Sequence, residues 1–128
     1  MIPRTIFSFD HQLFRDSVRK FLERDAVPFH AQWEKDGHID RQLWRKAGEA
    51  GMLCSHIPEE YGGMGADFLY SAVVIEEIAR LGLTGIGFSL HSDIVAPYIL
   101  HYGSEALKHK YLPKLVSGEM VSAIAMTE

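Results

Sequence analysis

Apolar residues recur at the spacing of a helix face through most of the chain, in blocks separated by proline, glycine and capping residues. The first block runs from about Asp10 to Lys35, and Val18 and Leu22 lie four residues apart on its apolar face. Pro28 falls inside this block. Because a proline ring does not fit an unbroken helix, we expect a kink or a restart there.

Two further helices are predicted on either side of a central loop. Asp40 is a candidate N-cap for the first, and Gly51 follows it as a C-terminal stop. Residues 57–65 are rich in Pro and Gly and show no period, so they are predicted to form the loop. The next helix, from about Asp67 to Leu81, is apolar on nearly all sides, which predicts burial among other helices.

The last third of the chain contains two more predicted helices and a short apolar tail. The first runs from about Ile86 to Tyr102 and stops at Gly103, and the second begins after the candidate N-cap Ser104. Residues 120–128 are predicted to form a strand, or a last helix that is cut short. The pattern therefore predicts one all-α domain, an irregular bundle of about five to six helices.

Composition narrows the class of protein. The 128 residues are 47% hydrophobic and 23% charged, which is ordinary for a globular domain and excludes disordered and collagen-like chains. The net charge of −4 speaks against a nucleic-acid-binding protein, and no stretch is apolar enough to predict a membrane span. The single cysteine, Cys54, cannot form an intrachain disulfide and favours a reducing, intracellular compartment.

The residues of this chain do not predict a self-contained active site. No phosphate-binding glycine loop is present, no Glu is followed by His three residues later as in di-iron bundles, and the seven histidines are scattered. We therefore predict no metal site and no catalytic residue, and Cys54 is expected to be a small core residue. His91, Ser92 and Asp93 interrupt an otherwise apolar helix. They either line a pocket or form the wet face of that helix, and the residues alone leave both interpretations open.

Several short motifs are informative through their order. These motifs are residues 43–51 (LWRKAGEAG), 58–65 (PEEYGGMG), 76–80 (EEIAR), 102–105 (YGSE), 110–115 (KYLPKL), 117–119 (SGE) and 123–128 (AIAMTE). Over nearly all 128 residues the chain resembles the N-terminal helical domain of flavin-dependent acyl-CoA dehydrogenases. Residues 88–92 (FSLHS) and the closing AIAMTE are similar to the long-chain branch of that family.

The resemblance implies an architecture and a reaction. Residues 1–128 would be the N-terminal domain, with the middle β domain and the C-terminal helical domain absent from this chain. The complete enzyme would dehydrogenate a medium- or long-chain acyl-CoA to the trans-2-enoyl-CoA: a carboxylate base takes the α proton and FAD takes the β hydride. Electrons would then pass to an electron-transfer flavoprotein. The resemblance also implies a homotetramer, located in the cytoplasm or, in a eukaryote, in the mitochondrial matrix.

The resemblance further assigns site residues. Residues 125–128 match the first four positions of the family's flavin signature. Four residues are therefore expected at the edge of the flavin: Ile124, Ala125, Met126 and Thr127. Three residues are expected to face the acyl chain: Leu90, His91 and Ile94. The catalytic glutamate and the CoA-binding arginines are expected beyond residue 128, so we expect residues 1–128 alone to bind FAD weakly or not at all and to be inactive.

Other functions remain as alternatives. The chain could be a stand-alone helical interaction module without catalysis, and a reading frame that continues with the rest of the flavin signature would separate this from an enzyme. Within the enzyme class, the alternatives are a short- or branched-chain acyl-CoA dehydrogenase and an acyl-CoA oxidase. A substrate-length series on the complete protein would separate enzymes of different chain-length preference.

Overall fold

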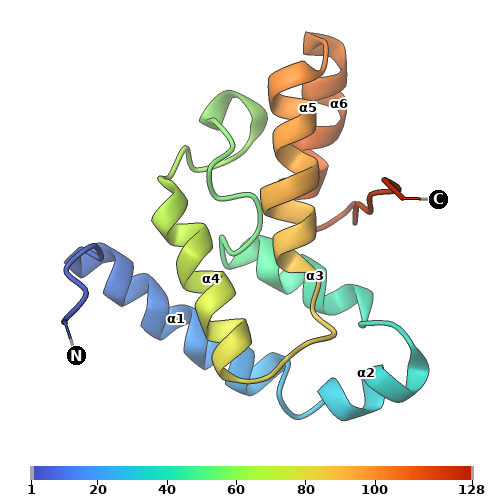
Figure 1. Cartoon of the computed structure of the whole chain (residues 1–128). Helices are drawn as coiled ribbons and strands as arrows, with labels where there is room; N and C mark the ends of the chain where they lie inside the picture. Colours follow the sequence, from blue (N-terminus) through green and yellow to red (C-terminus); the bar gives the residue numbers. More distant parts are fainter. Residues whose placement is uncertain (1, 128) are drawn as a thin grey trace.

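A computed structural model describes residues 2–127 (Figure 1). The elements, in chain order, are α1 (Phe9–Asp25), α2 (His30–Asp36), α3 (Arg41–Glu49), the short 3-10 helix η1 (Glu59–Tyr61), α4 (Phe68–Arg80), the π-helix η2 (Leu90–Val95), α5 (Ala96–Tyr102) and α6 (Glu105–Val116). Residues 2–127 contain no strand, and the predicted all-α fold is confirmed. Glu128, the fourth of the residues matched to the predicted flavin signature, lies outside the described residues.

The predicted helix boundaries are largely confirmed, and their causes are visible. Asp40, Asp67 and Ser104 each cap a helix by accepting a hydrogen bond from a backbone N–H two or three residues ahead. Pro28 lies in the turn between α1 and α2, where a break was expected. Within the predicted loop, Gly62 has a φ of 89° and ends η1, a conformation that favours glycine.

Two segments differ from the prediction. The helix expected over residues 86–102 opens with a π-helical stretch, Leu90–Val95, before it continues as α5. The tail is neither a strand nor a helix, because residues 121–127 leave α6 as irregular chain with no neighbouring strand among the described residues. A single extended segment has no hydrogen-bonding partner of its own, so its conformation depends on what it contacts.

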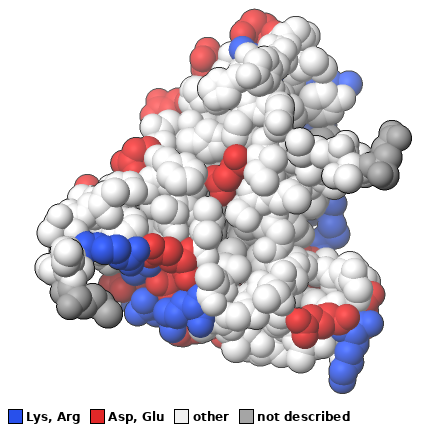
Figure 2. All heavy atoms as spheres, viewed as in Figure 1, with Lys and Arg blue, Asp and Glu red and all other residues white. Residues whose placement is uncertain are grey.

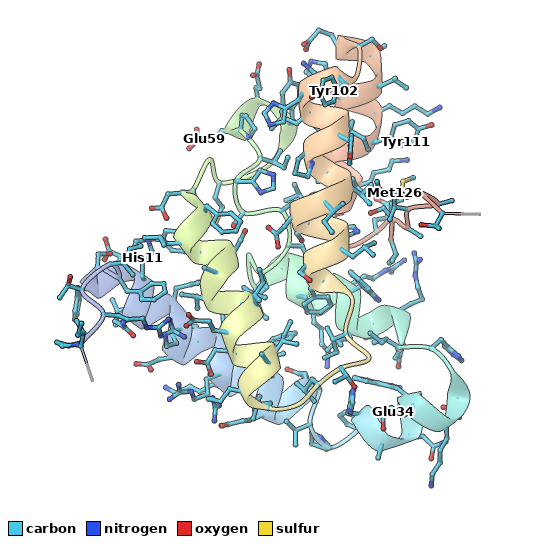
Figure 3. The ribbon with its side chains drawn as sticks, in the orientation of Figure 1. His11, Glu34, Glu59, Tyr102, Tyr111 and Met126 are labelled. Atoms are coloured by element: carbon cyan, nitrogen blue, oxygen red, sulfur yellow. The ribbon has the colours of Figure 1, made fainter. Side chains whose placement is uncertain are left out.

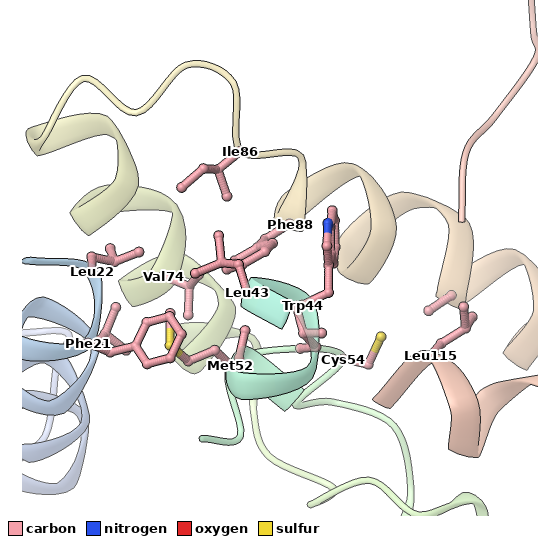
Figure 4. Packing of buried hydrophobic residues seen from close by; sticks show 14 of the residues in the cluster. Phe21, Leu22, Leu43, Trp44, Met52, Cys54, Val74, Ile86, Phe88 and Leu115 are labelled. Carbon is pink, nitrogen blue, oxygen red and sulfur yellow. The ribbon is translucent and has the colours of Figure 1, made fainter. Parts of the chain in front are cut away.

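The helices pack around one apolar core. α1 lies against α4, and α5 packs against α6 and η2. Trp44 of α3 belongs to this core, and its ring centroid lies 4.8 Å from that of the buried Phe88 (Figure 4). Leu22, Leu53 and Leu115 are also almost fully buried. No helix among the described residues is long and apolar enough to cross a membrane.

Candidate functional site

An apolar stripe runs along the outer face of η2 and α5. Leu90, Ile94 and Tyr98 follow one another at intervals of four residues and are 36%, 44% and 49% exposed. Beside this stripe lies a groove of about 300 Å³. Its walls are Asp93, Ile94, Pro97, Tyr98, His101 and Tyr102. The surface over α5 is mostly uncharged, and Tyr102 projects near the far end of the helix (Figures 2 and 3). The stripe suits an apolar partner, because it presents methyl, methylene and ring carbons to water.

His91 lies behind this stripe and is fully buried. Its Nε2 is 2.9 Å from the backbone oxygen of Leu115, and its Nδ1 is 3.2 Å from the backbone nitrogen of Ser122. The Ser122 hydroxyl oxygen also lies 3.0 Å from Nδ1, and the centroid of the Trp44 ring lies 5.2 Å from that of the His91 ring. Burial lowers the pKa of His91, although the Leu115 carbonyl and Asp93 oppose that shift. The ring is therefore neutral near pH 7.

A second polar pair lies between the groove and the core. The Nε2 of His56 and the Oδ1 of Asp93 are buried, and neither has a hydrogen-bond partner among the described residues. Burial raises the pKa of Asp93, and the Ser71 hydroxyl and His56 offset that shift only in part. Burial likewise lowers the pKa of His56. Both groups are thus biased toward their uncharged forms, as polar groups in an apolar setting are.

The tail leaves the body of the domain just behind His91. Met120 is tied to α6, since its N–H donates to the Lys114 carbonyl oxygen at 3.1 Å. Beyond it, the chain projects away from the helices and carries Met126 into solvent (Figures 1 and 3). Within the described part of the chain, the backbone amides of residues 123–127 make no hydrogen bond. These amides and the exposed Thr127 hydroxyl are therefore free to donate to a flat, polar ligand.

The structure links the two groups of residues that the sequence pointed to. Leu90 and Ile94 lie on the outer stripe, and residues 124–127 lie on the tail. His91 joins the two through Ser122, but its own side chain is turned into the core rather than onto the stripe. Of the two interpretations left open for residues 91–93, the wet face is wrong for His91 and Ser92, since both are buried.

Sequence reasoning missed three members of this region: Ser122, Trp44 and His56. Ser122 precedes the recognisable tail motif, and no local pattern signals that its amide reaches a histidine 31 residues earlier.

Cys54 is the buried core residue that was predicted. Burial raises the pKa of its thiol to about 12, which leaves no thiolate for nucleophilic chemistry near neutral pH. Among residues 2–127, no group of three or more His, Cys, Asp or Glu side chains could hold a metal ion.

Comparison with known proteins gives one consistent family. The family model described as "Acyl-CoA dehydrogenase, N-terminal domain" matches residues 8–119. The long-chain specific acyl-CoA dehydrogenase of Sus scrofa mitochondria is 51% identical over 98% of this chain, which spans 29% of that protein. Among solved structures, an acyl-CoA dehydrogenase of Geobacillus kaustophilus superposes with a TM-score of 0.93 at 49% identity, over 98% of this chain and 33% of that one. An acyl-CoA dehydrogenase of Bacillus anthracis, solved with FAD, matches with a TM-score of 0.84 at 32% identity, over 94% of this chain and 21% of its own.

Proposed function

The chain belongs to the acyl-CoA dehydrogenase family, and from that premise we propose that it forms the N-terminal domain of an enzyme that oxidises a medium- or long-chain acyl-CoA to the trans-2-enoyl-CoA. The chain spans about a third or less of the relatives it matches, so the proposal concerns the complete protein, with further domains beyond residue 128. The observation that carries it is the pairing of an exposed apolar stripe on η2 and α5 with a tail whose backbone donors are free.

The stripe is the proposed wall for the acyl chain. Leu90 and Ile94 present aliphatic side chains, and each methylene of an acyl chain buried against such a wall contributes roughly 0.8 kcal/mol. Tyr98 continues the wall toward Tyr102, so its length favours a longer acyl chain over a short one. His91 supports this wall from behind, and we do not assign it a contact with substrate.

The tail is the proposed donor set for FAD. Ile124, Ala125, Met126 and Thr127 offer unpaired N–H groups and one hydroxyl, which fits the polar edge of an isoalloxazine ring. When bound, FAD supplies the acceptor for the hydride that leaves the acyl chain. Donors fixed in advance stabilise negative charge at that edge, and the apolar stripe keeps water from the acyl chain.

The remaining parts of the reaction lie outside this chain. The base that removes the α proton is proposed to come from another domain. Among the described residues that line the groove, Asp93 is the one carboxylate, and its unpaired oxygen is buried. An electron-transfer flavoprotein is the proposed electron acceptor. Because the pig relative is mitochondrial, the proposed location is mitochondrial for a protein of eukaryotic source. For a bacterial source, the cytoplasm is the proposed location.

The complete gene product, loaded with FAD, tests this function. Anaerobic addition of saturated acyl-CoAs should bleach the flavin absorbance, with higher kcat/KM for long acyl chains than for short ones. Ile94→Trp should fill the groove and lower kcat/KM for long chains by about tenfold relative to short chains, which corresponds to ~1.4 kcal/mol.

Ile75→Trp is the matched control, because Ile75 is similarly exposed but lies on α4 and does not line the groove. It should leave the chain-length profile unchanged. The proposal fails if no acyl-CoA bleaches the flavin, and the assignment of the wall fails if Ile94→Trp lowers kcat/KM equally for all chain lengths.

A further inference from the structure

His91 contacts three elements at once: α3, the end of α6 and the tail. Its ring lies against Trp44 of α3, its Nε2 reaches the end of α6 at Leu115, and its Nδ1 reaches the tail at Ser122. We propose that His91 is a positioning residue, which fixes the direction in which residues 123–127 leave the domain and thereby the placement of their donors. This inference rests on the proposed function, because it gives the tail its role at the flavin.

The chemistry of the two partners fixes the state of the ring. A backbone carbonyl oxygen can only accept a hydrogen bond, so the Nε2 that faces Leu115 carries the proton. A backbone N–H can only donate, so the Nδ1 that faces Ser122 carries the lone pair. His91 is therefore a neutral imidazole of one tautomer, and both of its nitrogens are satisfied. A doubly protonated ring would set an N–H against the Ser122 N–H and break the anchor.

Ser122 is the last anchored residue before the proposed flavin contacts. Met120 is held by Lys114, and after it the only hydrogen bonds that described residues of the tail make are those of Ser122 to His91. Ile124 follows only two residues later, within roughly 7 Å of chain. A loss of this anchor therefore leaves the tail hinged at Met120, and the donors of residues 124–127 lose their common orientation.

The local backbone explains how a histidine reaches this place. η2 is a π-helix, which holds more residues per turn than an α-helix and so shifts the faces of its side chains. Leu90 and Ile94 keep to the outer stripe while His91, directly after Leu90, is fully buried. The same turn thus presents the proposed acyl wall outward and the anchor of the tail inward.

Two near-isosteric substitutions separate the two hydrogen bonds. In His91→Asn, the side-chain oxygen can occupy the place of Nδ1 and still accept from Ser122, whereas the bond to Leu115 is lost. In His91→Gln, the side-chain amide can reach the place of Nε2 and still donate to Leu115, whereas the bond to Ser122 is lost. Each variant removes one buried hydrogen bond. If His91 had only a structural role, the two variants would therefore lose similar amounts of free energy of unfolding and would not differ in FAD binding.

The experiment compares wild type, His91→Asn and His91→Gln in the complete, FAD-loaded protein. The readouts are the FAD dissociation constant, the flavin reduction potential, hydrogen exchange of peptides that cover residues 121–127, and Tm. His91→Gln should weaken FAD binding and speed exchange of the tail by about tenfold each, the worth of one buried hydrogen bond, whereas His91→Asn should stay close to wild type in both.

Four outcomes are possible. Equal effects of the two variants on FAD binding and on exchange overturn the proposal, as does faster exchange in His91→Gln with no change in FAD affinity or potential. Separation of the variants in the expected order supports it. If the wild-type protein does not bind FAD at all, the proposed function fails, and the ranking of the exchange rates still shows whether His91 holds the tail.

Discussion

Glu77 on α4 is 2% exposed and carries a full negative charge, whereas Asp93 on η2 has a buried, unpaired oxygen and is biased toward its neutral form. The difference lies in what faces each carboxyl group. Three arginines of the α1–α4 contact donate four hydrogen bonds to Glu77 at 2.8–3.1 Å. They are Arg15, Arg19 and Arg80. Burial would raise the pKa of Glu77, but these arginines overcome burial and bring the pKa to about 2.

Among the residues that the structure describes, no arginine donates a hydrogen bond to Asp93 behind α5. His56 and His91 are the neighbours whose charge would favour ionised Asp93, and burial lowers the pKa of both histidines. Figure 2 displays the same contrast on the surface, since basic and acidic side chains cluster together on the α1–α4 side and are sparse over α5.

One small domain thus keeps the charged contact that stabilises the fold apart from the region of the proposed site. The α1–α4 contact uses charge where the arginines can reach solvent, and it fixes the relative orientation of two helices. Behind the proposed acyl groove, a fixed charge would oppose the burial of methylenes, and burial shifts the pKa values of Asp93, His56 and His91 toward their uncharged forms. The second region is therefore held by close backbone packing and neutral hydrogen bonds.

Removal of the charge at Glu77 should have the largest effect. Glu77→Gln leaves three arginines without their common partner, and we expect a loss of about 3–5 kcal/mol in the free energy of unfolding. Urea denaturation near pH 7 measures it. Glu76→Gln is the matched control, because Glu76 is a third exposed and its pairs with Arg4 and Arg15 should contribute ~1 kcal/mol or less. Equal losses in the two variants would contradict the special role of the buried carboxylate.

A substitution at Gly118 tests the region around α3 and the end of α6, where close backbone packing rather than charge makes the contact. It has a φ of 72°, and a Cβ there would overlap the carbonyl oxygen of Trp44. Gly118→Ala should therefore cost about 2–4 kcal/mol, from the left-handed backbone and the clash together. Gly82→Ala is the control, since Gly82 has a similar φ of 65° but nothing within 4 Å. It should cost only about 1–2 kcal/mol. Thermal or urea unfolding that gave both variants equal losses would show that the α3–α6 approach can relax.

The sequence predicted the α1–α4 side of the domain more fully than the α5 side. The cap Asp67 and the break at Pro28 act within a few residues of chain, so local patterns reveal them. The apolar character of the helix over 67–81 predicted burial on all sides, but only one face of α4 is buried: Val73 and Val74 are buried, whereas Phe68 and Ile75 are exposed. The three arginines on Glu77 were not predicted, because two of them lie about 60 residues away in sequence.

The proposed site was predicted only in part, and for the same reason. Leu90 and Ile94 are exposed apolar residues of a helix, which a pattern reveals, but the π-helical turn that buries His91 has no simple sequence signal. The bond from Ser122 to His91 is a long-range contact, and the tail that it anchors has no period at all. The family resemblance pointed to Leu90, His91 and Ile94 but not to Ser122, and the burial of His91 is the reason why we propose a positioning role for it instead of a contact with the acyl chain.

Acid should separate the two regions by the pH at which each one weakens. His56 and His91 have pKa values lowered by folding, so they contribute stability above the unfolded pKa of ~6.5, and this is lost as the pH falls below it. Glu77 has a folded pKa of about 2, so its contribution is intact down to about pH 4.5 and is lost between there and pH 2.

Urea midpoints measured from pH 7.5 to pH 3 should therefore show two successive losses, each smaller than the effect of Gly118→Ala. His91→Asn should reduce the first loss, to which His56 still contributes, and leave the second, whereas Glu77→Gln should reduce the second and leave the first. A single transition shared by both variants would mean that the two regions are not electrostatically independent.

Asp93→Asn should give the smallest effect, and of the opposite sign. Folding raises the pKa of Asp93, so its ionised form is penalised once the pH exceeds the unfolded value of ~3.9 and the penalty is complete above the folded pKa. Near pH 7 the neutral amide removes that penalty, and we expect a gain of about 1 kcal/mol or less in the free energy of unfolding. The gain should vanish below about pH 4, where the carboxyl group is itself neutral. Asp16→Asn, an exposed position on α1, should change little at either pH. A loss of stability in Asp93→Asn at pH 7 would show that the carboxylate is stabilised there, and the contrast with Glu77 would then disappear.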